Sequence, residues 1–211
     1  MKPLPHGHGS NDSCAMLRDV YRICVIAGLL CAARGQSPAL PPNTPSGPIT
    51  TFGVTVFDSI GLRGDIYLLR PDTTSLPNLR KMKPVGAIYT NALNIPPRDF
   101  KEGFPGVTDR FEWFAIDYTG GFWIENPGKY RFLLASDDGS KLYVDNKLVI
   151  DNDGIHAIQT EVATVKLKGG AHRIRISYFQ GPRTSLALVL GVSRMDEPWR
   201  VFNTRDFLPP R

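Results

Sequence analysis

Alternation between apolar and polar side chains is the feature of this sequence that most restricts its fold. From Ile49 onward, helical periodicity is hard to find, whereas apolar residues recur at every second position in several short runs. A period of two places successive side chains on opposite faces of an extended strand. The runs 130–134 and 174–178 repeat in this way, and the run 186–190 is apolar on both faces, which is typical of a central strand.

Turn-forming residues separate these runs. Clusters of Asn, Asp, Gly and Pro occur at 126–128, 137–139, 145–146, 153–154, 169–170 and 181–182. Short strands at this spacing predict an all-β antiparallel sandwich or barrel. Because a strand with one apolar face must bury it against a second layer, we expect a β-sandwich with long loops and few or no helices outside the N-terminal leader.

The segment 58–110 is less regular. Residues 65–70 and 86–91 are typical of strands, and the Pro-containing stretch 71–84 between them is expected to be a loop. Pro96 and Pro97 indicate more loop. No internal repeat is present, so the sequence predicts one domain over residues 49–211.

The first 35 residues predict a signal peptide. The apolar run 23–33 follows two arginines and is shorter than the about 20 residues that a membrane-spanning helix needs, but it has the length of a secretory h-region. A small-x-small pattern at 33–35 predicts cleavage before Gln36, and Met16 is an alternative start that would leave an N-terminal extension. An uncleaved anchor or a buried core segment is the alternative. We expect a secreted or periplasmic protein with no membrane insertion after removal of the leader.

The linker, the cysteines and the net charge exclude several classes of function. Residues 36–48 are rich in Pro and Ser and predict a solvated linker. All three cysteines lie in the leader, so the mature chain would have no disulfide, thiolate metal site or Cys nucleophile. The formal net charge of +5 includes no Lys/Arg block, and we expect no nucleic-acid partner.

Two acidic turns make residues 136–156 the most informative stretch. The first contains Asp137 and Asp138, and the second contains Asp151 and Asp153. Adjacent carboxylates repel each other, and Ca²⁺, which takes about six to eight oxygen ligands, removes that repulsion and can also bind vicinal sugar hydroxyls. The alternative is that these aspartates only form turns, which composition alone favours. The EF-hand pattern is missing.

The same stretch resembles the protective-antigen-14 (PA-14) domain family, in its secreted bacterial single-domain type. The central motif is GKYRFLLASDDGSKLYVD, which starts at Gly128. Four further motifs match in order: residues 113–124, 148–156, 168–180 and 187–190.

This resemblance implies a β-sandwich of a kind found in surface adhesins, glycosidases and toxins. In the sugar-binding members, two consecutive aspartates joined by a cis peptide hold a calcium ion that contacts sugar hydroxyls, and these positions match Asp137 and Asp138. Those members also use an Asn in the loop after the strand that corresponds to 174–178. Here Gln180 stands in that place, followed by Gly181, so the implied ligand-binding residues are Asp137, Asp138, Gln180 and Gly181.

Several other residues could have a functional role, but each also has a simpler structural interpretation. His156 is a candidate for orienting Asp151 or Asp153, and His172 is expected to be structural. The cationic face at residues 173 and 175 is most simply a solvated sheet face. Three tryptophans are candidates for stacking on sugars, although packing is commoner for Trp in a strand: Trp113, Trp123 and Trp199.

The sequence lacks the nucleophile elbow, the P-loop and the H-E-x-x-H motif, and adjacent Gly-flanked aspartates suit a metal better than general acid catalysis, so we expect no enzyme. The leading hypothesis is an exported, non-catalytic, lectin-like domain that binds a glycan or cell-surface polysaccharide through Ca²⁺ at Asp137 and Asp138. The alternatives are an envelope module that binds a protein partner without a metal, and an accessory domain to glycan hydrolysis.

Overall fold

The computed structural model describes residues 61–107, 110–182, 185–195 and 197–210. All of the described residues lie in one compact unit, Pro38–Arg211. The predicted leader, the linker and the expected domain start at residue 49 lie outside the described part, so these boundaries stay predictions. No helix in the described ranges has the length and apolar content that crossing a bilayer requires.

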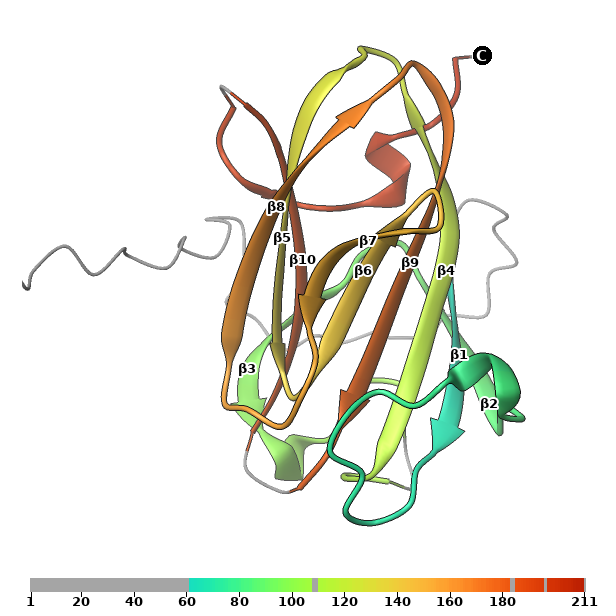
Figure 1. The fold of residues 1–211 in the computed structure, drawn as a ribbon, viewed down its shortest axis with the longest axis vertical. Helices are drawn as coiled ribbons and strands as arrows, with labels where there is room; N and C mark the ends of the chain where they lie inside the picture. Colours follow the sequence, from blue (N-terminus) through green and yellow to red (C-terminus); the bar gives the residue numbers. More distant parts are fainter. Residues whose placement is uncertain (1–60, 108–109, 183–184, 196, 211) are drawn as a thin grey trace, which may run out of the picture. The chain divides into compact units, whose positions relative to one another are not determined.

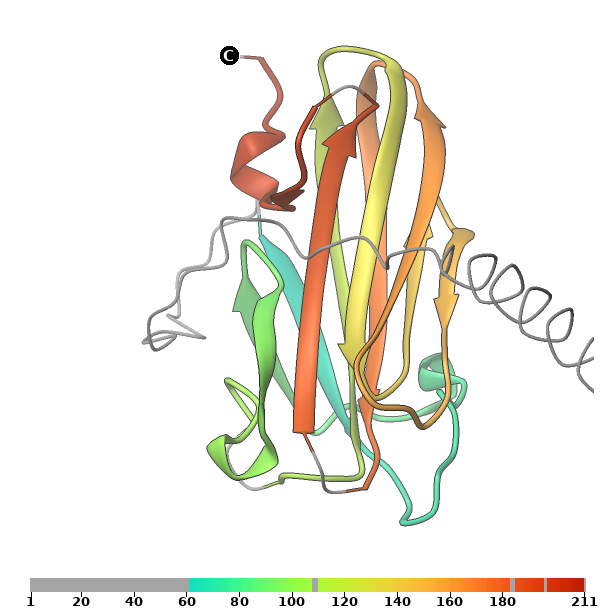
Figure 2. The ribbon, with the colours of Figure 1, turned by 90° about the vertical axis from the view of Figure 1, so that its left-hand side faces the viewer.

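Two antiparallel sheets form the fold, as the alternation predicts (Figures 1 and 2). The first has the order β2-β1-β4-β9-β6-β7: Gly86–Thr90, Leu62–Leu68, Phe114–Ile124, Gly170–Gln180, Ser140–Val144 and Lys147–Asn152. The second has the order β11-β10-β5-β8: Arg200–Val201, Ser185–Arg194, Gly128–Asp137 and Gln159–Leu167. Figure 1 shows β4, β9 and β6 side by side, with the chain between β1 and β2 curling past their lower ends.

The main core lies between the two sheets. Ile174, Ile176 and Tyr178 on β9 are buried, and the β10 run is buried on both faces. Such close packing of alternate side chains from facing sheets is what stabilises a sandwich. The β-sandwich expectation is therefore confirmed. Helical structure in the described residues is limited to three single 3₁₀ turns: η1 Leu79–Lys81, η2 Phe100–Glu102 and η3 Thr204–Asp206.

One expected loop is a strand. β3, Asn94–Asp99, contains Pro96 and Pro97 and pairs with β10, whereas the prolines predicted a loop. Proline lacks a backbone N–H, so it is tolerated in a sheet only at an edge or a bulge. Here β3 pairs with β10 alone, and the register shifts between Leu186 and Leu188, opposite the two prolines.

A small satellite cluster holds the loop between β1 and β2 on the sheet. Leu79 from η1 is buried against Tyr67, Ala115 and Phe179, with Leu76, Met82 and Trp113 packed around them. These side chains lie outside the main core and fix the 71–84 segment close to the ends of β4 and β9. The loop therefore has a defined position beside the site described below.

Candidate functional site

The paired aspartates lie where the chain crosses from one sheet to the other. Asp137 is the last residue of β5 in the second sheet, and β6 of the first sheet begins at Ser140. The Asp137–Asp138 peptide bond is cis, as the family resemblance implies. Both residues are buried, with exposed fractions of 1% for Asp137 and 3% for Asp138.

Asp138 is held by three hydrogen-bond donors from two separate segments. Its Oδ2 accepts from the Gly181 backbone N–H at 2.8 Å and from Gln180 Nε2 at 3.2 Å, and its Oδ1 accepts from the His156 backbone N–H at 3.2 Å. Burial nevertheless raises the pKa of Asp138 to about 6, and the charge of Asp137 adds to this rise. Two effects therefore oppose each other at Asp138: the hydrogen-bond donors favour the charged carboxylate, and the loss of solvation disfavours it.

Asp137 is less well satisfied. Its Oδ2 accepts a hydrogen bond from Ser185 Oγ at 2.5 Å, but its buried Oδ1 has no hydrogen-bond partner within the described part of the chain. Burial raises the pKa of this carboxyl as well. None of the ion pairs among the described residues involves Asp137 or Asp138. A buried carboxylate oxygen without a partner is costly, and a cation would satisfy it.

Gln180 presents its amino group, not its oxygen, to the aspartates. Its Nε2 donates to Asp138 and to the Ser185 carbonyl, each at 3.2 Å. Its Oε1 accepts from the hydroxyl of buried Tyr178 at 2.6 Å, and that hydroxyl also lies 2.8 Å from the Asp137 carbonyl oxygen. The structure thus brings Asp137, Asp138, Gln180 and Gly181 together, as the ligand set implied by the resemblance requires, and gives Gln180 the contacts of a residue that orients Asp138.

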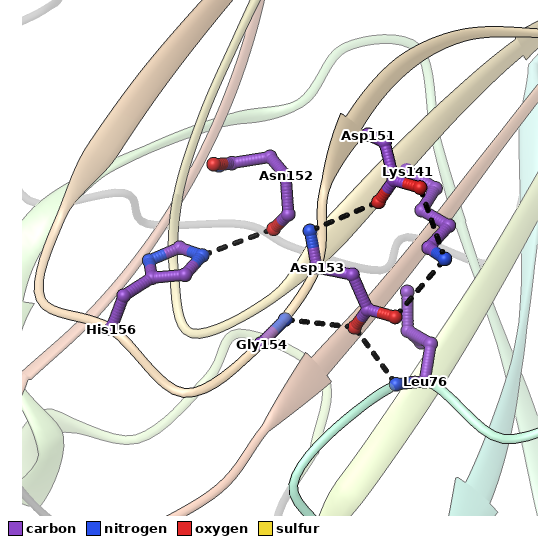
Figure 3. A network of polar contacts seen from close by, with 7 residues as sticks. All are labelled: Leu76, Lys141, Asp151, Asn152, Asp153, Gly154 and His156. Atoms are coloured by element: carbon purple, nitrogen blue, oxygen red, sulfur yellow. Dashed lines mark hydrogen bonds and ion pairs between the residues drawn. The ribbon is translucent and has the colours of Figure 1, made fainter.

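The second acidic turn is used by the fold itself (Figure 3). Asp153 Oδ1 accepts from the Leu76 backbone N–H at 2.8 Å, and Lys141 Nζ lies 3.1 Å from Asp153 Oδ2 and 3.3 Å from Asp151 Oδ2. Lys141 offsets one of the two negative charges of the turn, and the Leu76 hydrogen bond fastens the 71–84 loop to it. The two acidic turns therefore differ: Lys141 pairs with the second, and no cation among the described residues pairs with the first.

The expected role of His156 is wrong in its detail. Its Nε2 lies 3.0 Å from the Asn152 carbonyl oxygen (Figure 3), and its Nδ1 lies 2.9 Å from the Ala157 carbonyl oxygen. Neither nitrogen contacts the carboxylate of Asp151 or Asp153. It reaches the site through its backbone N–H, which donates to Asp138. No side-chain pattern in the sequence signals a backbone donor of this kind.

His172 has the structural role expected of it. Its Nδ1 lies 2.7 Å from Asp145 Oδ2, its Nε2 lies 2.9 Å from the Lys168 carbonyl oxygen, and its ring stacks on Phe122. The Asp145 contact joins the β6–β7 turn to β9. Burial raises the pKa of Asp145, but hydrogen bonds from the Arg173 backbone N–H and from His172 outweigh it and lower the pKa. Both groups hold a turn in place.

Two of the three tryptophans pack against apolar clusters, and the third lines a cavity. The Trp113 side chain belongs to the satellite cluster, although its backbone N–H donates to the Gln180 carbonyl at 2.9 Å. Trp199 packs on Leu133, Ala135 and Val189. Trp123 lines a separate cavity of about 230 Å³ near the C-terminal segment.

Ser185 and Tyr178 complete the site, and the sequence did not predict that either residue contacts Asp137. Ser185 begins β10, and Tyr178 lies in the regular apolar alternation of β9. Their hydrogen bonds span 48 and 41 residues, respectively, to Asp137. Contacts that join residues so far apart leave no local signal.

Removing Asp153 should weaken the fold without changing the paired aspartates. Asp153→Ala loses the Leu76 hydrogen bond and the better Lys141 ion pair, so we expect the free energy of unfolding to fall by about 2 kcal/mol. Asp151→Ala, which removes a half-exposed partner of the same lysine, should cost no more than about 0.5 kcal/mol. Urea denaturation of both variants measures the difference. Equal losses would show that the loop is not fastened through Asp153.

Comparison with known proteins agrees with this architecture. The model of the PA14 domain family matches residues 80–199, more than half of the chain. The chain therefore belongs to the PA14 domain family. No curated protein matches it.

Three solved structures illustrate the likeness. The PA14 domain of the antifreeze protein MpAFP has a TM-score of 0.60 and 17% identity, covering 74% of this chain and 94% of that one. The PA14 sugar-binding domain from an RTX adhesin has a TM-score of 0.56 and 16% identity, covering 69% and 96%. An anti-sigma factor domain-containing protein has a TM-score of 0.54 and 21% identity over 71% of this chain but 48% of its own length, so this chain spans about half of that relative. These likenesses show the fold.

Proposed function

We propose that this chain is an exported, non-catalytic carbohydrate-binding domain in which Ca²⁺ at Asp137 and Asp138 presents coordination positions to a glycan. Two buried, adjacent carboxylates, one with a partnerless oxygen, carry the proposal. Membership of the PA14 family and the likeness to a structure described as a sugar-binding adhesin domain support it. Export rests on the apolar leader, and the absence of the common catalytic motifs supports a binding role.

The residues present fit a hard cation. Asp137 and Asp138 would supply carboxylate oxygens, which Ca²⁺ prefers. No group of three His, Cys, Asp or Glu side chains able to hold a metal exists in the described ranges, so carbonyl, amide, water and sugar oxygens would complete the shell. That incomplete protein ligand set suits an ion that shares its coordination with a bound sugar.

Glycan binding in the presence and absence of calcium tests this function. The purified protein should bind at least one neutral glycan on an array in Ca²⁺, and EGTA should remove the binding. Binding that EGTA leaves unchanged would contradict the calcium-dependent mechanism. If no glycan is bound and Ca²⁺ does not raise the melting temperature, the protein-binding envelope module is the better interpretation.

Acidification should affect the metal-free and calcium-bound forms in opposite directions. Because the pKa of Asp138 is raised to about 6 from 3.8, the folded state holds its proton more tightly than the unfolded state between these values. This carboxyl therefore adds stability to the metal-free fold as the pH falls from about 6 towards 3.8, whereas in the calcium-bound protein protons compete with Ca²⁺ for the same carboxyl.

Melting curves of the native protein and Asp138→Asn, in EDTA and in Ca²⁺, measure this effect. In EDTA, the native protein should gain stability relative to Asp138→Asn on acidification; in Ca²⁺, the melting-temperature rise caused by the ion should shrink. Parallel pH profiles for the two proteins in EDTA would show that Asp138 titrates normally.

A further inference from the structure

A second concave site lies on the outer face of the six-stranded sheet. Lys141 and Tyr143 on β6, and Arg175 and Ser177 on β9, alternate with buried core residues and so point away from the core. The 76–80 segment forms the opposite wall, which encloses a cavity of about 450 Å³. A smaller cavity of about 190 Å³ adjoins it and shares Arg80, Tyr143, Asn146 and Arg175. We refer to the two cavities together as the outer groove.

The outer groove is cationic. Arg80, Lys141, Arg173 and Arg175 line it, and Asp117 is the only carboxylate among its lining residues in the described part of the chain. Lys141 is paired with the second acidic turn, and Arg175 with Asp117. Arg80 and Arg173 are exposed, and neither takes part in an ion pair among the described residues. Their charges remain available to an anion from solution.

Arg175 is fixed before any ligand arrives. Its Nε lies 2.8 and 2.9 Å from the two oxygens of buried Asp117, which also accepts from Ser177 Oγ at 2.7 Å. Its guanidinium carbon lies 5.0 Å from the centroid of the Tyr143 ring. No hydrogen bond within the described residues uses its Nη groups. A guanidinium held at Nε and on one face retains a planar pair of donors that matches a carboxylate or sulfate.

The expectation that residues 173 and 175 form a plain solvated face is therefore wrong for Arg175. Its guanidinium is held by buried Asp117, and burying a carboxylate costs free energy. That cost would be unusual if Arg175 only contacted water. The 76–80 wall is fixed as well, through Leu79 in the satellite cluster and Leu76 on Asp153 (Figure 3). Both walls of the outer groove are thus ordered by contacts that do not involve the paired aspartates.

We propose that the outer groove binds an acidic polysaccharide through the carboxylate or sulfate groups of its sugars, independently of calcium. The two adjoining cavities, the fixed guanidinium and the two unpaired arginines suit repeated anionic groups on an extended chain. The anionic character follows from the groove itself, and only the saccharide class rests on the proposed function. Arg80 and Arg173 attract the anionic chain, and Arg175 binds one acidic group in a defined orientation.

Binding of hexagalacturonate by the full chain, measured by calorimetry in EGTA, tests the proposal. Arg80→Ala/Arg173→Ala should weaken binding by about tenfold or more, because two charge-assisted contacts are lost. Lys129→Ala/Lys166→Ala is the matched control: it removes two exposed charges that lie opposite each other on β5 and β8 of the other sheet. This control should change affinity by no more than about twofold.

Two further probes identify the ligand class. Dextran sulfate tests whether sulfate replaces carboxylate, and either acidic saccharide binding through Arg80 and Arg173 supports the proposal. Hexaglutamate tests a protein ligand, and neutral maltohexaose should not bind in EGTA. Hexaglutamate binding as tightly as the saccharides would overturn the saccharide assignment. Failure of both acidic saccharides to bind, or equal losses in the two double variants, would overturn the site.

The calcium site can be separated in the same experiment. Asp138→Asn should remove calcium-dependent binding of neutral glycans and leave hexagalacturonate affinity in EGTA unchanged. Loss of hexagalacturonate binding in Asp138→Asn would show that there is one site, not two, and would overturn the proposal. Failure of neutral glycans to bind at all would count against the proposed calcium-dependent function and would leave the result for the outer groove standing.

Discussion

Asp138→Asn should abolish the stabilisation of this protein by calcium. A ligand that binds only the folded state stabilises it by RT ln(1 + [L]/Kd), so Ca²⁺ at about one hundred times its dissociation constant should add about 2.7 kcal/mol to the native protein. Asn keeps the shape of Asp138 but removes the charge that the ion requires. In the absence of metal, the variant should lie within about 1 kcal/mol of the native protein, because the lost charge was itself poorly solvated.

Melting temperatures across a calcium titration measure this difference. Asp153→Asn is the control, because it removes a charge from the neighbouring acidic turn, where Lys141 already supplies the cation. The control should retain the full calcium-induced rise in melting temperature. If calcium still raises the melting temperature of Asp138→Asn, or fails to do so only in Asp153→Asn, then our assignment of calcium to the first acidic turn is wrong.

Gly139→Ala should be the most damaging small substitution near the site. A Cβ on Gly139 would lie 2.3 Å from the Phe179 ring and 2.8 and 2.9 Å from the backbone nitrogen and oxygen of Gly154. Backbone atoms cannot rotate away as the end of a flexible side chain can, so we expect a loss of about 3 kcal/mol. Because Gly154 belongs to the second acidic turn, the same substitution should push the two turns apart.

Gly128→Ala is the matched control for this prediction. No atom lies within 4 Å of its added Cβ, so the free energy of unfolding should change by no more than about 1 kcal/mol. For a domain of this size the expected difference between the two variants is about 10 °C in melting temperature. Similar melting temperatures would mean that the close approach of residues 139 and 154 is not maintained in solution.

The sandwich was predictable because the alternation of apolar and polar residues in its strands is visible in the local sequence. The alternation over 130–134 and 174–178 requires a buried face and an opposing layer, and the structure supplies both. β3 was not predictable, because Pro96 and Pro97 are read locally as breakers. Their acceptance depends on a bulge in β3, where the two prolines lie opposite the single residue Ala187 of β10, and this pairing with a strand about 90 residues away is set by the tertiary fold.

The two aspartates of the candidate site could be predicted from the sequence, but most of the residues that contact them could not. Asp137 and Asp138 are visible as a pair in the sequence, and the family resemblance links them to Gln180. Ser185 and the His156 backbone N–H reach the pair through the fold alone. The same holds for the outer groove, since Asp117 and Arg175 are 58 residues apart and only the pairing of β4 with β9 makes them neighbours.

A crystal structure of the native protein grown with Ca²⁺ tests the central claim most directly. Our account predicts a strong anomalous peak within bonding distance of carboxylate oxygens from both Asp137 and Asp138, with at least one coordination position open to solvent or occupied by a sugar hydroxyl. A map at saturating calcium that shows no density between these carboxylates, or an ion bound at Asp151 and Asp153 instead, would contradict it.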